Sequence, residues 1–237
     1  MHKSFNGLKL LKLFTMKQYR YYSIITGIFA ACLVISNILD TKFFQIGDTV
    51  FPGGIILFPI VYVFGDILTE VYGYAQSRKV IWTGLFSLLL LIITIEITRR
   101  LPSASFWQNQ TAFDAILGHV PRIVIASVSA YFVGEFLNSF TIAKMKVKQG
   151  GKSMAIRFVA STLIGEAADT SVFIIIAFTG TMAIGEMAQV FLSAWLFKVL
   201  WEVIALPVSI PLVKRLKKIE NEDHYDRDTN FSPFKIS

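Results

Sequence analysis

The chain has 237 residues, of which 54% are hydrophobic and only 16% are charged, and its formal net charge is +7. About a quarter of the residues in a soluble domain are charged, so this composition excludes an ordinary soluble protein and indicates a polytopic membrane protein. The single cysteine, Cys32, lies within an apolar stretch, which excludes an internal disulfide and a cysteine-based metal cluster.

Six apolar segments approach the roughly 20 residues that a helix needs to cross a bilayer. In chain order they are residues 21–39, 55–72, 80–98, 123–143, 158–179 and 187–213. The first is longer than a signal-peptide core and lacks a cleavage site, so we expect it to stay in the mature protein. The sequence therefore predicts an all-α domain of six transmembrane helices over residues 21–213. Three crossings followed by three more would form a 3+3 inverted repeat.

Basic residues concentrate before the first segment and after the second, fourth and sixth segments. Because Lys and Arg favour cytoplasmic loops, this pattern predicts that both termini are cytoplasmic. Residues 1–20 would form a basic segment and residues 214–237 a charged tail, which is polar enough from residue 220 onward to be disordered. We attribute the positive charge to contact with anionic membrane lipids rather than with nucleic acid.

Two connections on the opposite face are long. Residues 40–54 are rich in Gly and Pro and read as a turn-rich loop, whereas residues 99–122 mix aromatic and polar residues and predict a short amphipathic helix. Trp107 in this second connection could belong to a lid over the bundle or to an aromatic belt at the membrane interface.

Three glycine-acid pairs interrupt the apolar segments, namely Gly65-Asp66, Gly134-Glu135 and Gly165-Glu166. A charged side chain at bilayer depth costs roughly 2.5 to 3.5 kcal/mol, so the acids are expected to line an internal polar site rather than face lipid. Each adjoining glycine would let a neighbouring helix approach closely. The alternative is three unrelated packing seams, each with one tolerated acid.

The helical period places further polar side chains on the same faces as these acids. They are Tyr62 and Glu70 beside Asp66, Tyr131 and Asn138 beside Glu135, and Asp169 beside Glu166. Carboxylates could accept hydrogen bonds from a planar, guanine-like base or carry protons. The residues alone also allow an organic cation, a small amine or a hard metal ion. A zinc hydrolase is disfavoured because no histidine lies within a predicted span, and we predict no metal site and no cofactor.

The sixth segment carries its own charges. Lys198 and Glu202 are four residues apart, a spacing that predicts an ion pair on one helix face. The alternative is a role of these two charges in binding the substrate or a proton. Pro207 and Pro211 are expected to kink the end of this helix.

Several strings, in order, resemble the bacterial queuosine precursor transporter family, which is also grouped as a vitamin uptake transporter family. They are SNILDTK (36–42), FPIVYVFGDILTEVYG (58–73), FWQNQTAFDAILGHVPRIVIAS (106–127), AYFVGEFLNS (130–139), RFVASTLIGEAADTSVF (157–173) and AFTG (177–180). The resemblance covers nearly the whole chain between the first and sixth crossings.

The resemblance implies import, across the bacterial inner membrane, of the 7-deazaguanine bases used to build the modified tRNA nucleoside queuosine. These ligands are the cyano base, the aminomethyl base and queuine. Carried onto this chain, the family's polar positions are Asn37, Asp66, Glu70, Arg122, Asn138, Arg157, Glu166 and Asp169. Many relatives have Gln in place of Glu135 or Glu166, and Asp in place of Asn138, so the base contacts of this chain are expected to differ in detail.

The resemblance suggests a role for each of these positions. Glu135 or Glu166 would accept the ring N–H and amino protons of the base, and Asn37 and Asn138 would read its carbonyl. The remaining acids, Asp66, Glu70 and Asp169, would hold the amine of the 7-substituent or relay protons. Arg122 and Arg157, at helix starts, would gate access or anchor at lipid headgroups.

Two other functions remain open from the sequence. The chain has no GxxxxGK[ST] loop, so a substrate-binding subunit would need a separate ATP-driven module. An intramembrane enzyme is disfavoured because no pair of nucleophile and base is evident. The small-residue seams permit a homodimer without requiring one.

Overall fold

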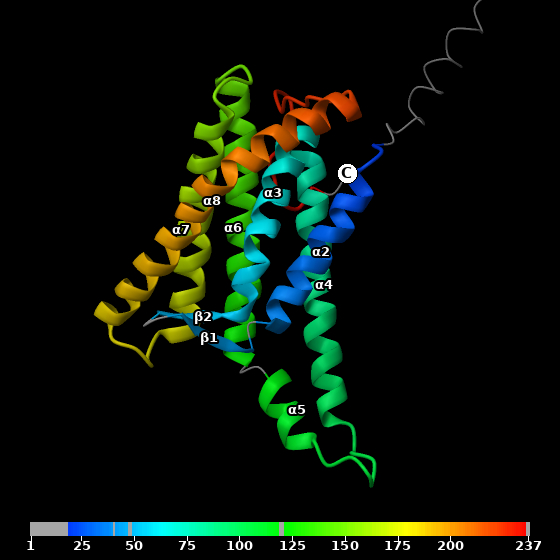
Figure 1. Cartoon of the computed structure of the whole chain (residues 1–237), viewed down its shortest axis with the longest axis vertical. Helices are drawn as coiled ribbons and strands as arrows, with labels where there is room; N and C mark the ends of the chain where they lie inside the picture. The colour runs from blue at the N-terminus through cyan, green and yellow to red at the C-terminus, as the bar shows by residue number, and fades with distance from the viewer. Residues whose placement is uncertain (1–18, 40, 47–48, 119–120, 236–237) are drawn as a thin grey trace, which may run out of the picture.

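The computed structural model describes residues 19–39, 41–46, 49–118 and 121–235. Each of the six predicted segments lies mostly within one α-helix, although the second begins three residues before its helix (Figure 1). These helices are α2 (Tyr22–Leu39), α3 (Phe58–Tyr72), α4 (Tyr74–Arg100), α6 (Pro121–Lys148), α7 (Met154–Phe178) and α8 (Ile184–Glu220). Four of them, α2, α4, α7 and α8, are long and apolar enough to cross a membrane. The protein is therefore a helical membrane protein, and six crossings and an inverted repeat remain predictions.

The long connections contain short elements. Residues 40–54 include an antiparallel hairpin of β1 (Phe43–Ile46) and β2 (Thr49–Pro52), and the 3-10 turn η1 (Gly53–Ile56) follows. The expected short helix after α4 is α5 (Gln110–Leu117), which Arg99 ties to the end of α4 through Asp114 at 3.0 Å. Helix α8 continues through both of its prolines as far as Glu220.

The helices alternate in direction, so two ends of the bundle can be distinguished (Figure 1). One end, here called the basic end, contains the start of α2, the α3–α4 junction, the α6–α7 turn and the end of α8. The hairpin, α5 and the α7–α8 connection lie at the other end. Glu220 accepts the backbone N–H groups of Arg20 and Tyr21, so both ends of the described chain meet at the basic end. The cytoplasmic placement of both termini remains a prediction.

Helices α6 and α7 pack closely because two of the predicted glycines face each other. A Cβ atom on Gly134 would lie 2.7 Å from the Cβ of Asp169, and one on Gly165 would lie 2.9 Å from the Cβ of Asn138. Such distances are shorter than any normal contact, so only glycine allows this approach. The glycines thereby set the positions of the polar residues on both helices.

Gly134→Ala is expected to destabilise the protein by about 1 to 3 kcal/mol, because the added methyl group overpacks the α6–α7 contact. Thermal unfolding of the purified protein in detergent measures the change. Gly27→Ala in α2 is the matched control, since nothing lies within 4 Å of its added carbon. Equal stability of the two variants would show that α6 and α7 are not in close contact.

The tail after α8 is ordered in the structure as far as residue 235, so the predicted disorder from residue 220 onward is wrong for this part. Its chain runs back across the basic end and contacts the start of α4. Asp226 accepts the backbone N–H of Tyr74 at 3.0 Å and 3.2 Å. Arg78 donates to the carbonyls of Asn230 and Ser232 at 2.8 Å and 2.7 Å. Composition suggested disorder because the partners of these polar groups are distant in sequence.

Two tail residues form a pH-sensitive contact. The hydrogen bond to Asp226 raises the pKa of His224 above its usual value, although burial opposes this. Burial disfavours the Asp226 carboxylate, but its bonds from His224, the Tyr74 backbone and Thr229 outweigh burial and lower its pKa. Because the pKa of His224 is raised, its protonated form stabilises the docked tail, and this contribution is complete below about pH 6.5. Because the pKa of Asp226 is lowered, its ionised form stabilises the docked tail, and this contribution is complete above about pH 3.9.

The tail is therefore expected to loosen as the pH rises from about 6 to about 9, because His224 loses its proton and its attraction to Asp226. Hydrogen exchange of residues 221–235 in the purified protein measures this loosening. His224→Gln should remove the pH dependence. An exchange rate of the wild-type tail that, after correction for intrinsic chemistry, does not change over this range would contradict the prediction.

Candidate functional site

A cluster of polar side chains from four helices lies inside the bundle. We call it the acidic cluster, and its members are Asp66 of α3, Glu135 and Asn138 of α6, Glu166 and Asp169 of α7, and Lys198 and Glu202 of α8. Asp66, Glu135, Glu166 and Glu202 are buried, and the other three are partly buried. The structure therefore brings all three glycine-acid pairs to one region, and the Glu135 carboxylate lies directly against Gly65.

Lys198 joins the two acids of α7. Its Nζ lies 2.6 Å from Oε2 of Glu166 and 2.6 Å from Oδ2 of Asp169. The predicted pair between Lys198 and Glu202 is therefore wrong. The spacing of these two residues on α8 permits the contact, but α7 presents two carboxylates to the same ammonium group, and two partners compensate a buried charge better than one.

Asp66 connects α3 to two other helices. Its Oδ1 accepts a hydrogen bond from Nδ2 of Asn138 at 2.7 Å. Its carboxyl group also lies close to the carboxyl group of Glu202 on α8. Within the described part of the chain, no hydrogen-bond donor reaches Oδ2 of Asp66, Oε1 of Glu202 or Oε2 of Glu135. These oxygens are buried acceptors that a ligand or a proton could satisfy.

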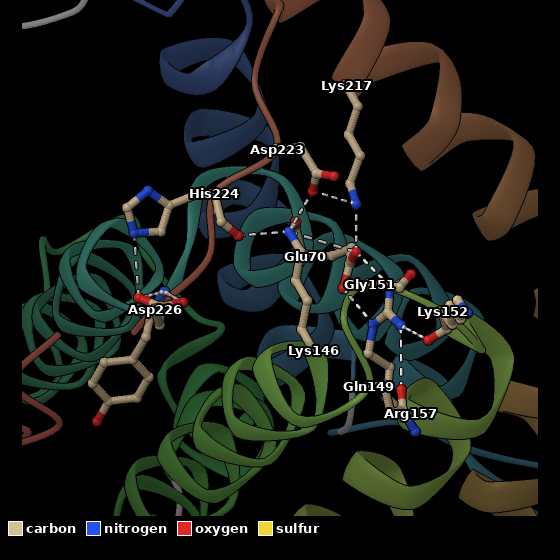
Figure 2. A network of polar contacts seen from close by, with 11 residues as sticks. Glu70, Lys146, Gln149, Gly151, Lys152, Arg157, Lys217, Asp223, His224 and Asp226 are labelled. Atoms are coloured by element: carbon tan, nitrogen blue, oxygen red, sulfur yellow. Dashed lines mark hydrogen bonds and ion pairs between the residues drawn. The ribbon is translucent and has the colours of Figure 1, made fainter. Parts of the chain in front are cut away.

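Glu70 and Arg157 lie in a second polar group at the basic end (Figure 2). Nε and one terminal nitrogen of Arg157 donate to the two Glu70 carboxylate oxygens, both at 2.6 Å. Lys217 also contacts Glu70, and Asp223 of the tail bridges Lys217 and Lys146 at 2.7 Å and 2.6 Å. We call these residues the Glu70 network.

The Glu70 network corrects two sequence-based assignments. Both oxygens of Glu70 are taken by cations, so the structure separates Glu70 from the ligand-accepting acids with which it was grouped. Arg157 is 0% exposed, so anchoring at lipid headgroups is wrong for this residue. Sequence reasoning missed Lys146, Lys217 and Asp223 here, because no local spacing links residues so far apart along the chain.

The remaining predicted residues lie in different places. The Tyr62 ring packs 5.9 Å from Lys198 Nζ, beside the acidic cluster. Tyr131 donates its hydroxyl to the Ile81 carbonyl at 3.2 Å, and Asn37 donates to the Leu33 carbonyl of its own helix at 2.9 Å. Trp107 is exposed in the connection before α5. The side chain of Arg122 lies outside the described residues.

Apart from the acidic cluster, the described residues include an apolar cavity but no metal-binding group. Among the residues that the structure describes, no three His, Cys, Asp or Glu side chains form a metal-binding group. The Lys198 ammonium already lies between the acids of α7, where a cation would otherwise sit. A cavity of about 320 Å³ lies elsewhere, between α2, α3 and α8, and is mainly apolar. Its lining residues are Tyr21, Ile25, Phe64, Ile67, Leu212, Arg215, Leu216 and Ile219.

Curated relatives cover most of the chain. It is 25% identical over 195 residues to the "Probable queuosine precursor transporter" of Bacillus subtilis, an alignment that spans 82% of this chain and 84% of the relative. It is 26% identical over 169 residues to the "Queuosine precursor transporter" of Escherichia coli, spanning 70% and 74% of the two chains. A Haemophilus influenzae relative with the same name as that of B. subtilis is 29% identical over 125 residues, or 53% and 51% of the two chains. No solved structure matches this chain.

A family match defines the class of protein. Residues 52–212 match the family described as "Putative vitamin uptake transporter". This range contains every member of the acidic cluster, whereas Lys217 and the tail lie beyond it. Transport, rather than an enzymatic reaction, is the activity of this family. The chain is therefore a membrane transporter and belongs to this vitamin uptake transporter family.

Proposed function

We propose that this protein imports queuosine precursors, the 7-deazaguanine bases, across the bacterial inner membrane for tRNA modification. The observation that carries the proposal is the acidic cluster, in which four helices direct buried hydrogen-bond acceptors into one region. The names of the three relatives support the choice of substrate. Six crossings with both termini in the cytoplasm complete the proposal.

Glu135 is the acid best suited to bind the edge of the base. Its Oε2 is buried and, among the described residues, has no donor, whereas Glu166 is already paired with Lys198. A guanine-like edge presents a ring N–H next to an amino group, and one carboxylate can accept both. Asn138 lies one turn further along α6 and uses one N–H on Asp66, so its second N–H can donate to the base carbonyl.

This arrangement should discriminate between bases. Adenine presents an acceptor where guanine presents its ring N–H, so it would leave the buried Glu135 oxygen unsatisfied. Sites built around such hydrogen bonds reject analogues that lack the donor by large factors. We therefore propose that unlabelled guanine-like bases compete for transport and that adenine does not.

The test is uptake of labelled 7-cyano-7-deazaguanine by liposomes that contain only the purified protein. We expect saturable entry, and about a 10- to 100-fold loss in Glu135→Ala, as for removal of a hydrogen-bonded charged group. Glu186→Ala, at an exposed position at the start of α8, is the matched control. Wild-type entry rates in Glu135→Ala would overturn the assignment of this residue. Entry that needs an added ATP-driven module would instead support a binding subunit.

A further inference from the structure

Asp66 and Glu202 form an unusual contact between α3 and α8. Each residue is only 2% exposed, and their carboxyl groups lie close to each other. Asp66 Oδ1 accepts a hydrogen bond from Nδ2 of Asn138. Among the described residues, no hydrogen-bond donor reaches Asp66 Oδ2 or Glu202 Oε1. Two carboxyl groups therefore meet at a place where each has an unsatisfied oxygen.

Such a contact needs a proton. Two ionised carboxylates are both acceptors, so they repel each other and cannot form a hydrogen bond. If one of them is protonated, it donates to the other and the repulsion disappears. The contact is thus complete with one proton and unstable with none.

The surroundings do not supply a positive charge in place of the proton. The charged groups that face the pair are Glu135 of α6, Glu166 of α7 and Glu70 on the next turn of α3. Lys198 lies one turn before Glu202, but its ammonium group is held by Glu166 and Asp169. Glu70 is likewise neutralised by Arg157 and Lys217. Asn138, the direct neighbour of Asp66, is uncharged.

Building on the proposed function, we propose that Asp66 and Glu202 together bind one proton that is carried inward with each base. The proton would enter the pair from the outer side and leave to the cytoplasm, with no other bond made or broken. With the proton in place, α3 and α8 are held together; without it, the two carboxylates push these helices apart. Asn138 connects the pair to the base, because it contacts Asp66 and lies one turn from Glu135.

Liposomes that contain the purified protein can separate proton coupling from base transport. With an acidic exterior, wild-type protein should accumulate labelled 7-cyano-7-deazaguanine inside, and a protonophore should abolish the accumulation. Glu202→Gln can donate a hydrogen bond to Asp66, but its side chain cannot ionise. We expect gradient-driven accumulation to fall at least about tenfold in this variant, and the number of protons taken up per base transported to fall as well. Glu186→Gln, which also removes one carboxylate from α8, is the control and should behave as wild type.

Each outcome decides one of the two proposals. Accumulation by Glu202→Gln at the wild-type level, or wild-type accumulation that follows a sodium gradient instead of the pH gradient, would overturn the proton site. If the wild-type protein exchanges no base at all, the proposed function itself is wrong. Should Glu202→Gln fail to fold, the number of protons taken up per base by the wild-type protein, measured with a trapped pH dye, decides the matter. One proton per base supports the site and none refutes it.

Discussion

Replacing Glu70 with alanine is expected to lower the free energy of unfolding by about 3 to 5 kcal/mol, the usual cost of removing one partner from a buried ion pair. Glu70 compensates Arg157, which is fully buried, and also contacts Lys217 (Figure 2). Without this carboxylate, the positive charges of Arg157, Lys146 and Lys217 would lie close together. Only Asp223, at the edge of the network, would remain to compensate them. Equilibrium unfolding in detergent micelles, followed by tryptophan fluorescence, measures the loss.

A double replacement tests whether the loss arises from this pair. Arg157→Met combined with Glu70→Gln removes both charges and should be less destabilised than the sum of the two single variants. Asp228→Ala removes an exposed carboxylate from the tail and should leave stability almost unchanged. A loss below about 1 kcal/mol in Glu70→Ala would show that the Glu70 network does not hold the basic end together.

Replacing Lys198 with methionine is expected to reduce uptake of the base at least tenfold. Lys198 holds Glu166 and Asp169 at 2.6 Å each, so its loss leaves two carboxylates of the same helix close together without a cation. Removing one partner of such a buried pair typically costs about 3 to 5 kcal/mol. The acids would then separate or take up protons, and either change would alter the acceptors of the acidic cluster. Initial rates of uptake by liposomes measure the effect.

Two further variants make this result specific. Lys214→Met, also on α8 but exposed, is the matched control and should transport at the wild-type rate. Asp169→Asn added to Lys198→Met lowers the uncompensated charge, so it should restore part of the folded yield. Uptake by Lys198→Met at the wild-type rate would show that the lysine is not needed to arrange the acids.

The helices could be predicted from the sequence because their signal is local. An apolar run of sufficient length is a property of neighbouring residues, and each of the six segments lies mostly within one α-helix. The grouping of Asp66, Glu135 and Glu166 could also be predicted, since burial of a charge in lipid is costly enough to direct all three acids inward. The close approach at Gly134 and Gly165 follows from the same pattern.

The partners of the charges could not be predicted in this way. Lys198 was paired with Glu202 because four residues separate them on one helix, yet its partners lie 32 and 29 residues away, as the differences 198 − 166 and 198 − 169 show. Glu70 binds Arg157 and Lys217, which are 87 and 147 residues away. The tail was expected to be disordered because its own composition offers no core. It is ordered by backbone and aromatic partners on α4.

The sequence by itself determined the class of the protein, the positions of its helices and the inward placement of its acids. These follow from hydrophobic length, helical period and the cost of burying charge, all of which act within a single segment. Only the tertiary structure decided which acid meets which cation, that Asp66 meets Glu202, and that the tail covers the basic end. Those contacts depend on how helices far apart in the chain pack against one another, and no local spacing encodes that packing.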